Sequence, residues 1–292
     1  MSNNMMVMSL LAGGFVLLPP LIGGLIAGLD RIITARMQSR VGPPLLQPFY
    51  DLIKLFSKQN IASNRFHRHY LMCYIIFMIF SGAMFFSGRD LLLVIFAYTL
   101  ADIFLVMAAF SATSPYSFIG AQRELIQLIA AEPILLITAL GMNMACGSFN
   151  TAEMFKCKEV LFLDLPGVFF ALVFVLTFKL RKSPFDLSTS HHGHQELVKG
   201  LTTEFAGRTL GIFELAHFYE TVLLLGIIYL FFAPYWWLAL LVIALTYFAE
   251  LVIDNTYARA KIKLSLLWTW ALTIAIGGGN LVVLYILGHV RN

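Results

Sequence analysis

The chain has little charge for its length. Only 12% of its 292 residues are charged, whereas a typical soluble domain is about a quarter charged. Hydrophobic residues make up 59%, and the mean hydropathy is +0.81. The apolar residues come in runs of roughly 18 to 25, the length that a helix needs to cross a bilayer. The sequence therefore predicts an all-α polytopic membrane protein rather than a soluble domain.

The motifs of cofactor chemistry are also missing. The three cysteines, Cys73, Cys146 and Cys157, include no Cys-x-x-Cys pair of the kind that binds zinc or an iron–sulfur cluster. There is no glycine-rich phosphate loop, and the glycines at 277–279 lie inside an apolar run. We therefore expect no metal, no cofactor and no catalytic site in this chain.

About eight apolar segments are long enough to be transmembrane helices. They are 7–29, 70–87, 91–111, 120–146, 161–179, 212–233, 235–253 and 264–288. The first contains Pro19 and Pro20, which we expect to kink it. What remains is too short for a soluble domain, so we expect residues 1–292 to form a single membrane domain.

The basic residues predict an orientation in the cell membrane. If the N-terminus lies outside, sixteen of the twenty Lys and Arg residues fall in cytoplasmic segments. Arg89, Lys156, Lys158 and Arg291 then remain outside, a distribution that the positive-inside rule favours. Because topology accounts for the basic residues, the net charge of +4 is no indication of a nucleic-acid partner.

The first long loop on the predicted cytoplasmic side is 30–69. A Gly-Pro-Pro sequence at 42–44 ends the preceding helix. Apolar residues then recur over 45–56 at three- and four-residue spacings, with Asp51 and Lys54 between them, as in a helix lying on a membrane surface. Two interpretations stay open, because such a helix either only rests on the membrane or also docks a soluble partner.

The second long loop is 180–211. It contains three carboxylates, Asp186, Glu196 and Glu204, and three closely spaced histidines, His191, His192 and His194. Three histidines are one pattern of a metal site. This group, however, has no pair at helical i, i+4 spacing and no adjacent carboxylate. A loop that titrates near neutral pH is the favoured interpretation.

Three carboxylates lie deep inside predicted spans, where an ionisable group costs roughly 2.5–3.5 kcal/mol on insertion scales. Asp102, Glu132 and Glu220 are eight to twelve residues from the cytoplasmic ends of three different spans, at depths of roughly 12–18 Å. Groups at one depth on neighbouring helices can relay protons within the membrane plane. The alternative is that each carboxylate only hydrogen-bonds between helices.

Two further pairs of titratable residues extend this pattern toward the cytoplasmic side. Glu214 and His217, at i and i+3, share a helix face and would link the deep acids to the loops. Glu250 and Asp254, at i and i+4, lie near the cytoplasmic end of their span. We predict that these residues join Asp102, Glu132 and Glu220 in an ion pathway.

Motifs along nearly the whole chain resemble one family. They are Arg40-x-Gly-Pro with Leu46-Gln-Pro-x-x-Asp-x-x-Lys-Leu, Ser114-Pro-Tyr-Ser with Gly120-Ala-x-Arg-Glu124 and Glu132, Ser183-Pro-Phe-Asp186 with Gln195-Glu-Leu and Thr203-Glu-Phe-Ala-Gly207, and Asp254-Asn-x-x-Ala-Arg259. The first three sets resemble the H subunit of respiratory complex I and the matching membrane component of membrane-bound nickel–iron hydrogenases, and the last motif resembles the hydrogenase branch.

The resemblance implies a subunit that joins a soluble redox arm to an ion-pumping membrane arm. It implies as partners the hydrogenase small and large subunits and an iron–sulfur subunit on the cytoplasmic side, which hold the nickel–iron centre and the iron–sulfur clusters, and an antiporter-like subunit in the membrane. Within the matching motifs we expect Glu124 to join the ion pathway. The residues expected to couple the loops are Arg40, Asp51, Lys54, Asp186, Glu196 and Glu204.

Two departures from the complex I pattern favour one branch of this family. Ser-Thr-Ser-His-His-Gly-His follows Asp186 where complex I has a compact acidic run, and Lys179 stands at the place of a complex I glutamate. The chain therefore resembles the membrane subunit of an energy-converting (Ech-type) hydrogenase, which couples ferredoxin-dependent hydrogen chemistry to proton or sodium translocation. The alternatives are the quinone-site H subunit of a complex I-type NADH dehydrogenase, a solitary secondary transporter and a passive membrane anchor.

Overall fold

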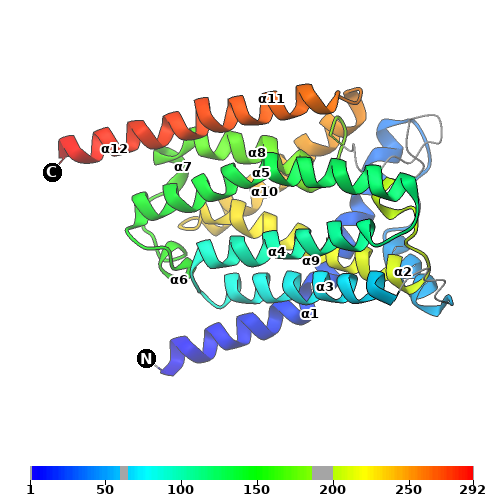
Figure 1. Cartoon of the computed structure of the whole chain (residues 1–292). Helices are drawn as coiled ribbons and strands as arrows, with labels where there is room; N and C mark the ends of the chain where they lie inside the picture. The colour runs from blue at the N-terminus through cyan, green and yellow to red at the C-terminus, as the bar shows by residue number, and fades with distance from the viewer. Residues whose placement is uncertain (1, 60–64, 186–199, 292) are drawn as a thin grey trace.

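The structure, a computed structural model, describes residues 2–59, 65–185 and 200–291, and those ranges contain helices and no β-strand (Figure 1). The elements are α1 (Ser2–Met37), α2 (Gln47–Ser57), α3 (Arg65–Phe86), α4 (Leu91–Phe110), α5 (Pro115–Cys146), α6 (Thr151–Met154), α7 (Leu161–Asp164), α8 (Pro166–Lys179), the 3₁₀ turn η1 (Gly200–Thr202), α9 (Arg208–Leu230), α10 (Trp236–Thr256), α11 (Ile262–Leu272), the π-helical η2 (Thr273–Gly278) and α12 (Gly279–Arg291).

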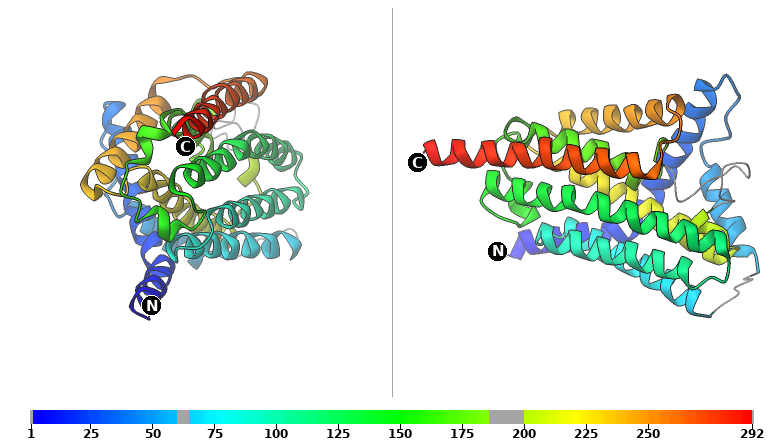
Figure 2. Two further views of the ribbon diagram at one scale, coloured as in Figure 1. Left: turned by 90° about the vertical axis from the view of Figure 1, so that its left-hand side faces the viewer. Right: turned by 45° about the horizontal axis from the view of Figure 1, so that its top comes forward.

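Seven helical segments in the described ranges are long and apolar enough to cross a membrane, which confirms the predicted all-α polytopic fold. They belong to α1, α3, α4, α5, α9, α10 and the continuous stretch from α11 to α12. The helices run side by side as an elongated bundle. Figures 1 and 2 place α2 at one end of the bundle and both chain termini at the other.

The predicted span 161–179 differs from the other seven. The short helix α7 ends at Asp164, and α8 then begins at Pro166 and has only 14 residues, or about 21 Å of helix against roughly 30 Å of hydrocarbon. Pro166 lacks a backbone N–H and therefore suits the first position of a new helix. Because α8 is largely buried within the bundle, it has little need to match the bilayer thickness.

The helix predicted within the first loop is present as α2. Its N-terminal end packs so closely on α1 that a Cβ atom at Gly28 would clash with the carbonyl oxygen of Leu45. On the other side, Leu55 and Phe56 contact α9 at Gly211. A glycine-lined approach of this kind fixes α2 to the bundle, so that α2 is part of the packed structure and not only a membrane-surface helix.

The end of the second loop packs against α5. A Cβ atom at Gly120 would clash with the backbone nitrogen of Leu201, so only glycine allows η1 to come this close. Leu201 itself is fully buried. The contact places the chain that leads into α9 one helical turn from Glu124 of α5.

Candidate functional site

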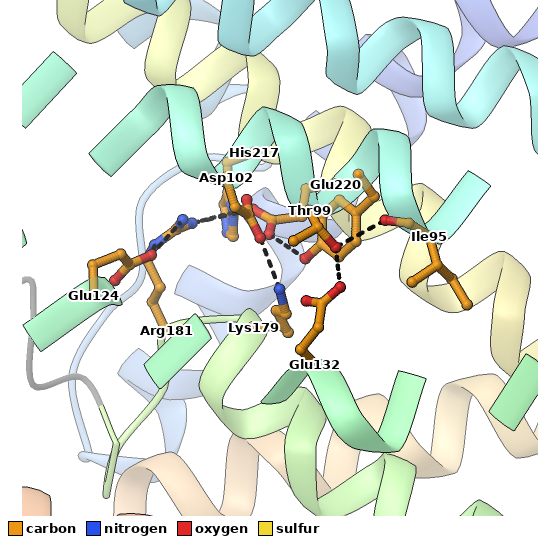
Figure 3. A network of polar contacts seen from close by, with 10 residues as sticks. Ile95, Thr99, Asp102, Glu124, Glu132, Lys179, Arg181, His217 and Glu220 are labelled. Atoms are coloured by element: carbon orange, nitrogen blue, oxygen red, sulfur yellow. Dashed lines mark hydrogen bonds and ion pairs between the residues drawn. The ribbon is translucent and has the colours of Figure 1, made fainter. Parts of the chain in front are cut away.

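Seven titratable side chains meet inside the bundle, and we call them the central charged cluster (Figure 3). They are Asp102 of α4, Glu124 and Glu132 of α5, Lys179 at the end of α8, Arg181 just after it, and His217 and Glu220 of α9. The structure thus brings together the three deep carboxylates predicted from the sequence, and adds two cations that the sequence had led us to assign to a loop.

Asp102 and Lys179 form a buried ion pair. The Lys179 Nζ atom is 2.7 Å from Asp102 Oδ2, and the two side chains are only 7% (Lys179) and 5% (Asp102) exposed. Lys179 Nζ also lies 4.3 Å from the centre of the Tyr98 ring, a cation–π contact. Removing one charge of such a pair leaves the other uncompensated in a low dielectric, which is strongly unfavourable.

Glu220 is the most highly connected acid of the cluster. Its Oε1 atom accepts a hydrogen bond of 2.7 Å from the Tyr98 hydroxyl. Its Oε2 atom lies 3.1 Å from both Arg181 and His217 Nδ1. The Arg181 guanidinium also pairs with Glu124 Oε1 at 3.0 Å. One arginine therefore bridges carboxylates of α5 and α9.

Arg181 has an unusual backbone. Its φ angle is +51°, in the left-handed region that costs a residue with a Cβ atom about 1–2 kcal/mol. The left-handed turn comes directly after α8, where the backbone N–H of Arg181 bonds to the carbonyl of Phe178. Strained residues of this kind persist where the surroundings hold them, and they gather at functional sites. Here the two carboxylate partners hold the side chain.

Some oxygen atoms of the cluster lack a protein partner. Glu132 accepts a hydrogen bond from the Thr99 hydroxyl through one oxygen, but its other oxygen and Asp102 Oδ1 have no hydrogen-bond partner among the described residues. A cavity of about 10 Å³ lies between Asp102, Lys179 and Glu220, which is about the space of a single water molecule.

The cluster contains more acids than cations. Four carboxylates, at 102, 124, 132 and 220, face two cations, Lys179 and Arg181, together with the titratable His217. Burial makes uncompensated charge expensive. An arrangement with an excess of acids is therefore chemically suited to binding and releasing protons.

A polar cavity of about 370 Å³ connects the cluster to the loop end of the bundle. Arg181 and His217 belong both to the cluster and to the cavity wall, which also contains Glu214 and Arg31. A second cavity, of about 230 Å³, lies against α2 and includes Lys54, and Glu214 and Arg31 line it as well. Glu214 thus lines both cavities.

A second group of charges, the peripheral charged cluster, consists of Asp30, Lys182, Tyr247, Glu250 and Asp254. Asp30 Oδ2 lies 2.8 Å from Lys182 Nζ and accepts a hydrogen bond of 3.0 Å from Tyr247. Asp254 accepts a hydrogen bond of 2.8 Å from the backbone N–H of Ser183. Glu250 is only 1% exposed, and neither of its oxygens has a hydrogen-bond partner among the described residues.

The loop residues lie closer to the surface. Arg40 is exposed and donates a hydrogen bond to Gln38. Asp51 pairs with Arg31 at 2.5 Å. Partial burial acts to raise the pKa of Asp51, but hydrogen bonds from Arg31 and Gln47 outweigh it and lower that pKa below its ordinary value.

Other predicted loop residues have less defined surroundings. Glu204 is half-buried and lies close enough to His67 to interact with it electrostatically. Asp186, Glu196 and the three histidines at 191, 192 and 194 lie outside the described residues.

Sequence reasoning missed the cations of the two clusters. Lys179, Arg181 and Lys182 were counted as cytoplasmic loop charges, but all three are largely buried and pair with acids of the bundle. Asp30 and Tyr98 also escaped notice, since neither stands out in an apolar sequence. The signal that could have found the cations is their number, because three basic residues at the end of an apolar span can partly neutralise the acids buried in neighbouring spans.

The sequence matches a known protein family and several of its members. Residues 10–285 match the family described as NADH dehydrogenase. The H subunit of NADH-quinone oxidoreductase from Dehalococcoides mccartyi (strain CBDB1) is 26% identical over 96% of this chain and 86% of the relative. Hydrogenase-4 component C of Escherichia coli (strain K12) is 26% identical over 92% of this chain and 93% of the relative. Formate hydrogenlyase subunit 4 of the same organism is 27% identical over 66% of this chain and 67% of the relative.

The fold has a solved counterpart. A chain of the membrane-bound sulfane sulfur reductase, described as an archaeal respiratory membrane complex, superposes with a TM-score of 0.83 over 95% of this chain and 99% of that one, at 22% identity. The family match covers far more than half of the sequence, and the relatives are subunits of complex I-like and hydrogenase-type assemblies. This chain therefore belongs to the NADH dehydrogenase family and is a membrane subunit of a respiratory complex of that type.

Proposed function

We propose that this chain is the coupling subunit of an energy-converting hydrogenase, set in the cell membrane with its N-terminus outside. The central charged cluster is the observation that carries the proposal, because four acids of α4, α5 and α9 meet two cations there. Both cations lie at the start of the segment that leads into the second loop. Electron transfer in a soluble arm docked on the loops would shift that segment. The ion pairs would then rearrange, and the acids would take up or release protons.

The cavities supply a route between the loops and the cluster. Protons would pass from the cavity beside α2, which includes Asp51 and Lys54, to Glu214 and into the larger cavity. His217, which lines the larger cavity, lies 3.1 Å from Glu220 and would pass them on. From Glu220 the hydrogen bond of the Tyr98 hydroxyl leads to α4, where the Thr99 hydroxyl donates a hydrogen bond to Glu132 of α5.

The proposed partners follow the hydrogenase branch. A small and a large hydrogenase subunit with an iron–sulfur subunit would dock on the loops and hold the nickel–iron centre and the clusters, and an antiporter-like subunit would adjoin the bundle. Lys179 supports this branch. A glutamate at its place, as in complex I, would put a fifth acid where the cluster has the partner of Asp102.

Neutralising Glu132 tests the proposal. We expect Glu132→Gln, introduced into the intact complex and reconstituted in liposomes, to evolve hydrogen from an artificial electron donor at nearly the normal rate. Coupled proton or sodium transport should be abolished, since an amide cannot carry the proton. The measurement pairs gas chromatography of hydrogen with a fluorescent reporter of ion movement.

A matched control uses an acid outside the cluster. Glu153 of α6 is exposed at the opposite end of the bundle, so Glu153→Gln should change neither quantity. Normal ion transport in Glu132→Gln would refute the coupling role of the cluster and would favour a passive anchor.

A second candidate function is quinone binding. The polar cavity of about 370 Å³ falls within the size range of small-ligand pockets, roughly 300–1,000 Å³, and Tyr247 and His217 lie in its wall. Reduction of an added quinone by the purified complex, abolished by Ala27→Trp in the cavity wall, would favour this function. A solitary transporter has less support, because the relatives are subunits of assemblies.

A further inference from the structure

Two of the three cysteines lie together at the end of the bundle opposite the loops. The Sγ atoms of Cys146 and Cys157 are 2.9 Å apart, although the two residues belong to different elements. Cys146 ends α5, and Cys157 lies in the connection from α6 to α7. Both are free thiols in the structure and both are partly exposed. Sulfur atoms this close need to approach by less than about 1 Å to reach the bonding distance of a disulfide.

Packing holds both partners in place. The cap of α5 is Gly147, whose φ of +74° turns the chain away from the helix. The connecting loop is anchored independently, because the Thr151 hydroxyl donates to the carbonyl of Phe85 at 2.8 Å and the Phe155 ring packs against Tyr229. Since neighbouring contacts fix both backbones, the closeness of the two sulfurs is a property of the fold.

The position of the pair suits oxidation. The N- and C-termini share this end of the bundle, and the distribution of Lys and Arg predicts that it faces outward (Figure 2). Disulfides form and persist in compartments outside the cytoplasm. Cys73 lies within α3 and is a free cysteine.

We propose that Cys146 and Cys157 form a disulfide in the mature protein. The oxidant is an external disulfide, R–S–S–R. One cysteine loses its proton and attacks R–S–S–R as the thiolate; the released R–S⁻ takes up a proton to give one R–SH, which leaves a mixed disulfide. The second cysteine attacks that intermediate and releases the second R–SH, so two electrons and two protons pass from the cysteines to R–S–S–R. The bond closes the loop 146–157 and ties the outer end of α5 to the neighbouring loop. The proposal is independent of the coupling function.

Counting thiols tests it directly. The intact complex is purified in the presence of N-ethylmaleimide and denatured in the reagent. This chain is then examined by mass spectrometry before reduction, and again after reduction and a second treatment with the reagent. We expect one modified cysteine, Cys73, before reduction and three after it, together with a peptide pair joined at 146 and 157. Three modified cysteines before reduction would overturn the proposal.

Serine variants test the bond by a second route. Cys146→Ser and Cys157→Ser should each lower the melting temperature of the complex by several degrees, and the double variant should lower it no further, because either change removes the same bond. Cys73→Ser is the control and should have no such effect. Additive losses, or none, would overturn the proposal, and the thiol count on the unaltered protein decides the case if a variant does not assemble.

Discussion

The central and the peripheral charged clusters differ in how their buried charges are paired and how near they lie to the polar cavity. In the central cluster Lys179 and Asp102 are both less than a tenth exposed, and every carboxylate has at least one polar partner. In the peripheral cluster Asp30 is 25% exposed at the wall of a polar cavity, while Glu250 is buried without a hydrogen-bond partner among the described residues. The Lys179–Asp102 pair lies away from the polar cavity, whereas Asp30 and Lys182 both line it.

Adjacent residues connect the two clusters. Arg181 pairs with Glu124 and Glu220 of the central cluster, whereas Lys182 pairs with Asp30 of the peripheral one. A movement of this short segment therefore alters both at once. Lys179 and Asp102 do not line the polar cavity, whereas Asp30 and Lys182 do, so the Lys179–Asp102 pair should tolerate a missing charge much less than the Asp30–Lys182 pair does.

The largest expected effect comes from Lys179→Met. It leaves Asp102 unpaired in a buried place, which costs about 3–5 kcal/mol of stability, and it should also abolish ion coupling. Thermal unfolding of the purified complex measures the first effect and liposome transport measures the second. Adding Asp102→Leu removes the stranded charge, and we expect the double variant to recover most of the lost stability while remaining uncoupled.

Lys182→Met is the matched change in the peripheral cluster. Because its partner Asp30 is a quarter exposed and lies at a cavity wall, water can replace the lost contact, and the loss of stability should be clearly smaller. Equal losses of stability for the two lysine variants would contradict the distinction between a pair away from the cavity and a pair at its wall.

Glu250→Gln tests the comparison of the two clusters at an acid that has no hydrogen-bond partner among the described residues. The amide gives up no hydrogen bond that the structure shows, so stability should change by about 1 kcal/mol or less. Coupled ion transport should fall only in part if Glu250 feeds the pathway from the side. Glu220→Gln, which weakens contacts to Arg181 and His217, should be the more destabilising of the two.

Much of the fold and part of the site follow from the sequence for clear physical reasons. Hydrophobic runs fix where helices span, and the spacing of apolar residues around Asp51 fixes α2. The depth of Asp102, Glu132 and Glu220 correctly indicated that these acids lie near one another. Depth says nothing about what neutralises them, however. Lys179 and Lys182 lie at the polar end of a short helix, and only its burial, a tertiary property, directs them inward.

The smallest expected effect concerns the surface helix α2. Arg31 and Asp51 are 44% and 38% exposed, so water and salt screen their attraction, and the pair should contribute only about 0–1 kcal/mol. The folded protein lowers the pKa of Asp51 below 3.8, its value in an unfolded chain. The pair therefore stabilises the protein above pH 3.8, and this contribution disappears as the pH falls below that value.

Asp51→Asn measures this contribution. At neutral pH and low salt the variant should melt slightly below the unaltered complex, and the difference should vanish in high salt or as the pH falls below 3.8. A difference that persists in high salt and at low pH would contradict a solvent-screened ion pair. It would show instead that Asp51 acts mainly through a contact that salt does not screen, such as its hydrogen bond from Gln47.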